Sequence, residues 1–143
     1  MKIRIKRFDK DIPLPKYHTG GAAAFDLYAR ETVEIQPQTV GHVPLNVAIE
    51  CPEGHMWFLA ARSSTHKKGL LPANGVGIID SDFRGDEDEV KIPLLNFTDH
   101  AVTVMRGDRI AQGIFVKCEK AEWEEVGELG NKTRGGFGST GHR

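Results

Sequence analysis

Residues 43–49 read VPLNVAI and alternate between large apolar side chains and smaller or polar ones. Successive side chains of a β-strand point to opposite faces of the sheet, so this period of two predicts a half-buried strand. The same alternation occurs at residues 3–5 and 102–104. Short apolar runs separated by Gly, Pro and Asn turns predict further strands at 25–29, 56–61, 76–79, 90–95 and 110–116. Many short strands at this spacing predict an all-β fold, a sandwich or a barrel.

A helix is predicted at one place. Residues 63–68 (SSTHKK) open with residues that commonly cap helices, and Gly69 follows them. We therefore expect one short helix of a turn or two.

The length of 143 residues indicates a single domain spanning residues 1–143. With 39% hydrophobic and 27% charged residues, the chain does not have the composition of a disordered protein. No apolar run approaches the ~20 residues that cross a bilayer, and the opening MKIRIKRF lacks the apolar core of a secretory signal. The net charge of −1 is not that of a general polyanion binder. We expect neither a membrane nor a nucleic-acid partner.

The two cysteines, Cys51 and Cys118, are too few for a disulfide framework. They suit a reducing compartment, so we expect a cytoplasmic location. The histidines show no spacing typical of zinc ligands.

The last fourteen residues, GNKTRGGFGSTGHR (130–143), contain five glycines and one large apolar side chain, Phe137. Such a segment cannot bury enough apolar area to offset its ordering entropy, so we expect a mobile tail. One interpretation is a frayed end. The other is a tail that folds over a ligand, using Arg134 and Phe137.

Two segments carry most of the candidate chemistry. Residues 62–64 (RSS) combine a forked cation with two hydroxyls before the predicted helix, which favours an anion site; the alternative is ordinary helix capping. In residues 74–85 (NGVGIIDSDFRG), an apolar strand ends at Asp80, where a carboxylate can orient a water or bind a sugar hydroxyl. The alternative is that its acidic residues only form a hairpin turn. The acidic run 86–89 is expected to be a solvated hairpin tip.

Five segments, taken in order, resemble the motifs of the trimeric deoxyuridine triphosphate nucleotidohydrolases (dUTPases). They are AAFDLYA (23–29), RSS (62–64), NGVGIIDSDFRG (74–85), GDRIAQ (107–112) and RGGFGSTG (134–141). The resemblance implies a jelly-roll-like β-barrel, a homotrimer with three active sites, and Mg²⁺-assisted hydrolysis of dUTP to dUMP and pyrophosphate. It also implies that the tail, 130–143, closes over a neighbouring subunit's site.

The resemblance also implies roles for individual residues. The catalytic pair would be Asp80, which holds the attacking water and contacts the sugar, and Arg134, which binds the γ-phosphate. Asp26 would reach Mg²⁺ through water. The other substrate-binding residues would be Arg62, Ser63, Ser64 and Gln112 at the phosphates, Asn74, Ile78, Ile79 and Lys91 at the uracil, Phe83 under the deoxyribose, and Phe137 with Gly138 in the closing tail.

Three features depart from the family pattern, and one of them is the acidic run 86–89, which makes the stretch between Gly85 and Val90 a few residues longer than usual. Phe83 stands where the family usually has Tyr, and Lys132 occupies the more usual place of the tail cation, so Arg134 and Lys132 are both candidates for the γ-phosphate. The nearest competing enzyme is a dCTP deaminase, which also carries an Arg-Ser-Ser segment. Outside enzymes, the chain could be a nucleotide-binding regulatory module or a purely structural jelly roll.

Overall fold

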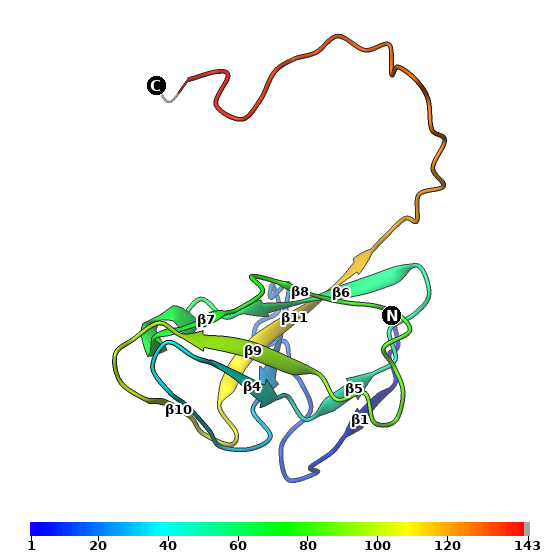
Figure 1. Cartoon of the computed structure of the whole chain (residues 1–143). Helices are drawn as coiled ribbons and strands as arrows, with labels where there is room; N and C mark the ends of the chain where they lie inside the picture. The colour runs from blue at the N-terminus through cyan, green and yellow to red at the C-terminus, as the bar shows by residue number, and fades with distance from the viewer. Residues whose placement is uncertain (142–143) are drawn as a thin grey trace.

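The computed structural model describes residues 1–141, and Figure 1 shows a body of short strands with a long C-terminal segment outside it. Its elements in chain order are β1 (Ile5–Arg7), β2 (Phe25–Tyr28), β3 (Val33–Ile35), β4 (Val40–Pro44), β5 (Val47–Ile49), β6 (His55–Ala61), the 3₁₀-helix η1 (Thr65–Lys68), β7 (Leu70–Pro72), β8 (Gly77–Ile79), β9 (Lys91–Asn96), β10 (Val102–Val104) and β11 (Arg109–Lys117). Within the described range, no helix is long and apolar enough to cross a bilayer. The predicted all-β fold is confirmed.

The strands of residues 1–141 pair antiparallel in four separate sheets, in the orders β2-β11-β6-β8, β4-β9-β7, β1-β5 and β10-β3. The arrangement is jelly-roll-like, but the sheets do not close into the continuous barrel that we expected. The two larger sheets share one core, in which Leu27 and Trp57 of the first meet Val43 and Ile92 of the second. This core packs against the sheet that carries Asp26 and Gln112 and whose strand β6 leads directly into Arg62.

The segment 43–49 differs from its prediction. It is not one half-buried strand but the end of β4 and the whole of β5, and all seven residues are buried. Asn46 breaks it with a left-handed φ of 68°, which Asn tolerates better than most residues. The Asn46 Oδ1 accepts from the Asp9 N–H at 2.6 Å, and its Nδ2 donates to the Asp9 carbonyl at 3.0 Å. Because β4 pairs with β9 and β5 with β1, the two parts of the segment belong to different sheets.

The short helix forms where it was predicted, as one 3₁₀ turn. The Ser64 side chain makes no capping hydrogen bond. The Thr65 hydroxyl instead accepts from the Arg62 N–H at 3.0 Å. The capping interpretation of Ser64 is therefore wrong, because the Ser64 hydroxyl is not occupied by a capping hydrogen bond.

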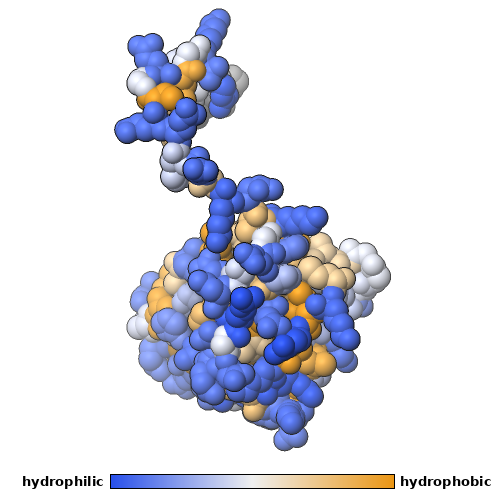
Figure 2. Space-filling view, turned by 90° about the vertical axis from the view of Figure 1, so that its right-hand side faces the viewer, coloured by the Kyte–Doolittle hydropathy of each residue, from blue (hydrophilic) through white to orange (hydrophobic). Residues whose placement is uncertain are grey.

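The C-terminal segment begins earlier than predicted. From Cys118 to Gly141 the chain forms neither strand nor helix and is exposed almost throughout, whereas the predicted tail began at 130. Figures 1 and 2 show this segment leaving the body. It carries Trp123 and Leu129, whose side chains are 90% and 82% exposed. The last two residues of the predicted tail, 142–143, lie outside the described residues.

Candidate active site

A carboxylate on β2 collects three basic side chains. Asp26 is only 9% exposed. Its Oδ1 accepts from the Arg62 Nε at 2.8 Å, and its Oδ2 accepts from an Arg109 guanidinium nitrogen at 3.3 Å. The His18 Nε2 lies 3.4 Å from the same Oδ2. These contacts orient both guanidinium groups at one end of the β2-β11-β6-β8 sheet.

Gln112 lies beside this cluster because of the strand register. It is opposite Asp26 on β2 and opposite Ala60 on β6, and residues directly opposite across strands share a face. The Gln112 Nε2 donates to the Ala61 carbonyl at 2.9 Å, next to Arg62 in the chain. The fold thus brings together the predicted residues of three separate motifs, 26, 62 and 112.

Ser63 and Ser64 follow Arg62 directly. Ser63 is exposed and Ser64 is half-buried. Two hydroxyls beside a guanidinium provide donors for phosphate oxygens. Together with Arg62 and Gln112, they form what we call the phosphate cluster. Its chemistry is that of an anion site.

Asp26 also suits the predicted water-mediated contact with Mg²⁺. Both oxygens already accept hydrogen bonds from arginines, which leaves room for a water but disfavours a bare cation. Mg²⁺ gives up its hydration reluctantly and usually keeps several waters. Residues 1–141 contain no group of three or more His, Cys, Asp or Glu side chains placed to hold a metal directly. Phosphate oxygens would therefore have to supply part of the coordination.

A second feature is a cleft of about 440 Å³ beside β8, a size typical of small-molecule sites. Its lining is largely apolar with charged groups at the rim, and consists of Ile78, Ile79, Asp80, Phe83, Glu89, Val90 and Lys91. Asp80 is exposed at the end of β8. We call it the nucleoside cleft, since an apolar slot with a few polar groups fits a base and a sugar. Five of its lining residues were predicted from the sequence.

We expected this cleft to lie in a hairpin of two paired strands, but the strands on its two sides do not pair with each other. β8 pairs with β6, whereas β9 pairs with β4 and β7, so the two walls belong to different sheets. Asn74 lies in the turn before β8, while Asp80 follows β8. Asn74 is not among the residues lining the cleft. Its contact with uracil stays a prediction that the isolated chain does not explain.

The phosphate cluster and the nucleoside cleft lie apart within one chain. Ile79 pairs with Trp57 near the start of β6, so Asp80 is at that end of the strand. Arg62 follows the other end. The length of the seven-residue β6 separates them, about 20 Å at 3.3 Å per residue. The two groups therefore lie at opposite ends of β6 within one chain.

Comparison with known proteins identifies the family to which these features belong. The family model described as dUTPase matches residues 10–141, nearly the whole chain. The chain belongs to the dUTPase family. A deoxyuridine 5'-triphosphate nucleotidohydrolase from Thermobifida fusca is 42% identical over 146 residues, which cover 99% of this chain and 79% of that protein.

Solved dUTPase structures share the fold. A crystal structure of dUTPase from Streptococcus mutans superposes with a TM-score of 0.76 at 31% identity, covering 83% of this chain and 98% of the other. A dUTPase of Staphylococcus bacteriophage 80alpha, described with dUpNHpp, has a TM-score of 0.86 at 24% identity and covers 99% of both chains. A phage phi11 dUTPase, described with a structural Mg(II) ion, has a TM-score of 0.80 at 21% identity, covering 90% and 99%.

The predicted tail residues of this dUTPase lie in the exposed C-terminal segment. Lys132 and Arg134 are exposed, and the Phe137 side chain is fully accessible. Phe137 has a left-handed φ of 51°, and Gly138 after it has one of 87°. The structure does not bring these residues to either half of the site.

Two neighbours of Asp26 were not predicted. Arg109 lies inside the fourth motif, but its sequence position did not show that it would face a carboxylate on β2. His18 lies in a segment with no periodic pattern. The contact of Arg109 with Asp26 becomes evident only from the pairing of β2 with β11.

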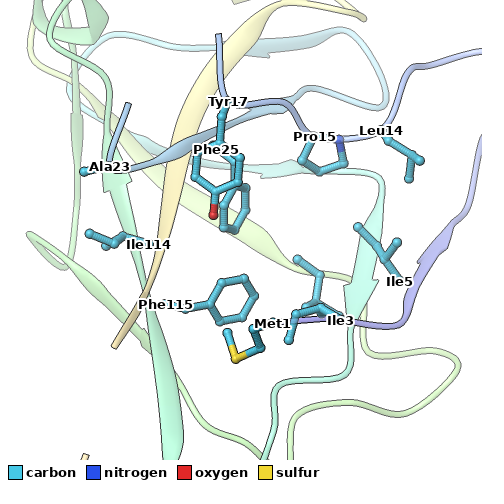
Figure 3. A pocket seen from close by; sticks show the side chains of 11 residues that line it. Met1, Ile3, Ile5, Leu14, Pro15, Tyr17, Ala23, Phe25, Ile114 and Phe115 are labelled. Atoms are coloured by element: carbon cyan, nitrogen blue, oxygen red, sulfur yellow. The ribbon is translucent and has the colours of Figure 1, made fainter. Parts of the chain in front are cut away.

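Another hollow in the described chain has a different lining. It measures about 520 Å³ and contains no charged side chain, so it does not suit a triphosphate. Figure 3 shows its aromatic wall, where Tyr17, Phe25 and Phe115 lie near Met1 and Ile3. Phe25 and Phe115 stack with centroids 5.5 Å apart.

Proposed function

We propose that this chain is a dUTP diphosphatase that hydrolyses dUTP to dUMP and pyrophosphate. The observation that carries the proposal is the nucleoside cleft with Asp80 at its rim, in a chain whose family is the dUTPases. The phosphate cluster supplies the complementary anion site. A purely structural jelly roll would require neither.

Asp80 is the proposed catalytic base. It holds a water and accepts its proton while the water oxygen bonds to the α-phosphorus. The bond from that phosphorus to the bridging oxygen then breaks, and pyrophosphate leaves. Phosphoryl transfer requires mainly positioning and charge stabilisation, so a carboxylate at the cleft rim is sufficient to orient the nucleophile.

The phosphate cluster holds the triphosphate. Arg62 donates as a fork, and Ser63, Ser64 and Gln112 add neutral donors. Mg²⁺ bound with the substrate would neutralise part of the triphosphate charge. Asp26 would hold that ion through water, and its carboxylate also keeps Arg62 oriented.

The nucleoside cleft sets specificity. Backbone groups at Ile78 and Ile79, with Lys91 opposite, bind the uracil edge, and Phe83 packs under the deoxyribose. A closely fitting slot excludes the thymine methyl and the ribose 2′-hydroxyl sterically.

The two cysteines are free thiols, which supports the cytoplasmic location that we propose.

The test of function is pyrophosphate release from dUTP, dTTP, dCTP and UTP, with Mg²⁺ and with a chelator. We expect rapid release from dUTP alone, at least about a hundredfold faster than from the others, and strong loss with the chelator. Ammonia released from dCTP would instead identify a deaminase. Binding of dUTP without turnover would favour a regulatory module.

We further propose a homotrimer in which the cleft of one copy faces the phosphate cluster of a second and the tail of a third closes the site. The separation of the two half-sites along β6 supports this, as do the exposed Trp123 and Leu129. We expect light scattering to give about three times the chain mass of 15.8 kDa. A fully active monomer at micromolar concentration would contradict the proposal.

A further inference from the structure

Only the first half of the acidic run 86–89 is the solvated tip that we expected, because Asp86 and Glu87 are exposed whereas Asp88 and Glu89 are half-buried. The Asp88 Oδ2 accepts from the Gly85 N–H at 2.7 Å. Lys6 Nζ donates to the Asp86 carbonyl at 2.6 Å and lies 3.6 Å from the Glu87 carboxylate. The Glu89 side chain is only 9% exposed. The segment is therefore attached to the body at both ends.

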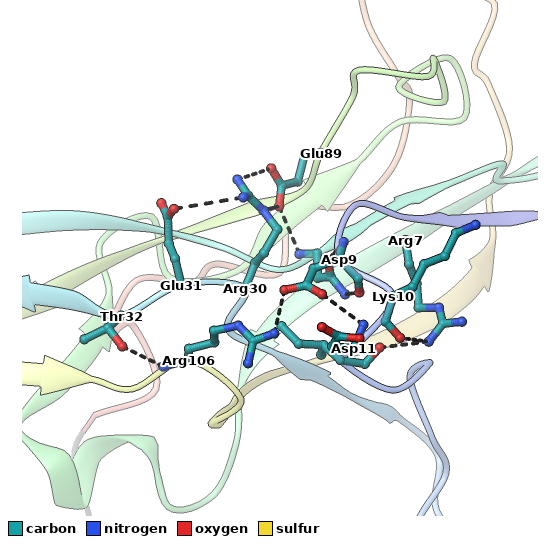
Figure 4. A network of polar contacts seen from close by, with 11 residues as sticks. Arg7, Asp9, Lys10, Asp11, Arg30, Glu31, Thr32, Glu89 and Arg106 are labelled. Atoms are coloured by element: carbon teal, nitrogen blue, oxygen red, sulfur yellow. Dashed lines mark hydrogen bonds and ion pairs between the residues drawn. The ribbon is translucent and has the colours of Figure 1, made fainter.

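Glu89 accepts three hydrogen bonds from the body, and Figure 4 shows its pair with Arg30. Its Oε1 accepts from the Arg30 Nε at 2.7 Å and from the Asn46 N–H at 3.1 Å, while its Oε2 accepts from a second Arg30 nitrogen at 3.1 Å. Such two-point pairs fix geometry as well as supplying attraction. The hydrogen bonds that Arg30 donates to Glu89 raise the pKa of Arg30 above its ordinary value.

Arg30 is itself held by the body. Its N–H donates to the Pro44 carbonyl at 2.8 Å, at the end of β4. Nearby, Arg106 pairs with Asp9 at 2.6 Å and thereby lowers the Asp9 pKa. The Arg30–Glu89 pair thus joins the 86–89 loop to a fixed part of the core.

The two walls of the nucleoside cleft have no strand pairing with each other. The wall containing Ile78 and Ile79 is attached to β6. The other wall is attached through Val90, whose N–H donates to Val47 and whose carbonyl accepts from Leu45. Since β8 and β9 belong to different sheets, the width of the cleft depends on how each wall is fixed to the body.

We propose that Arg30 and Glu89 are positioning residues that fix the cleft wall formed by residues 89–91. The position of this wall sets the width of the cleft, so that uracil fits and thymine is excluded. Neither residue takes part in the chemical step. Glu89 lines the cleft, but its carboxylate is occupied by Arg30 and the Asn46 N–H. The inference rests on the proposed hydrolysis of dUTP.

The test compares Glu89→Gln, Arg30→Gln and the double variant with wild type, on dUTP and dTTP. Glu89→Gln keeps an acceptor for Asn46 but loses the charge. We expect each single change to raise KM for dUTP about tenfold, with kcat within about threefold, and to lower discrimination against dTTP about tenfold. The double variant should be no worse than either single variant, because one interaction is lost in all three.

Lys6→Gln is the matched control, since Lys6 holds the same loop by exposed contacts and does not line the cleft. It should leave KM and discrimination unchanged. Arg30→Lys, which keeps the charge but loses the two-point geometry, should fall between wild type and Arg30→Gln; it also serves if the other variants are unstable.

Variants that melt at lower temperature with unchanged KM and unchanged discrimination would overturn the inference and leave the pair a purely structural role. Additive effects in the double variant would overturn it as well. Failure of the wild-type chain to hydrolyse dUTP would instead refute the proposed function, so the two failures are distinguishable.

Discussion

Asp80→Asn should lower kcat for dUTP at least about a hundredfold while the affinity for dUMP changes little. Asn matches the carboxylate in shape but cannot accept the proton of the attacking water. Asp80 is exposed at the cleft rim, so its replacement costs no core packing. Single-turnover pyrophosphate release, together with dUMP titration calorimetry, measures both quantities.

Asp82→Asn is the matched control. Asp82 is exposed two residues further along and does not line the cleft, so its variant should stay within a few-fold of wild type. If Asp80→Asn also stays within a few-fold, Asp80 is not the base. Equal losses in both variants would indicate a general electrostatic effect of the loop.

A chain truncated after Leu129 should fold, assemble and bind dUMP, but lose about a hundredfold in kcat for dUTP. Residues 130–141, the described part of the removed segment, form no strand and contribute no side chain to the buried core. Ordering a glycine-rich tail costs free energy, and we expect only the full triphosphate to offset it, because its γ-phosphate would pair with the tail cation. Turnover assays and circular dichroism compare the two chains.

Arg134→Ala should reproduce much of this loss, because a guanidinium can pair with the γ-phosphate through two donors. Lys132→Ala, its matched control in the same exposed segment, should lose little. The reverse order would assign the γ-phosphate to Lys132. Full activity in the truncated chain would favour the alternative interpretation, in which the tail is a frayed end.

The class of fold and most of the candidate site could be predicted from residue order. Period-two alternation is a local property, because neighbouring side chains of a strand must face opposite sides, so most strands could be located. Motif spacing is also local, and it identified Arg62, Asp80 and Gln112 through the family resemblance. The three-residue strands β3 and β7 were not predicted.

How these pieces are combined depends on contacts between distant parts of the chain. The break at Asn46 depends on a partner 37 residues away, Asp9, so no local pattern could reveal it. The placement of Arg109 and Gln112 against Asp26 follows from the register of β11 with β2. Glu89 looked like part of a solvated acidic run until folding placed it against Arg30, 59 residues away.

The separation of Asp80 from Arg62 is also a tertiary property. The two residues are close in the chain, but the antiparallel pairing of β6 with β8 sends them to opposite ends of one sheet. Residue order thus specifies which chemical groups the protein carries. Strand register decides which of them lie together in one chain, because pairing fixes distances that residue order leaves open.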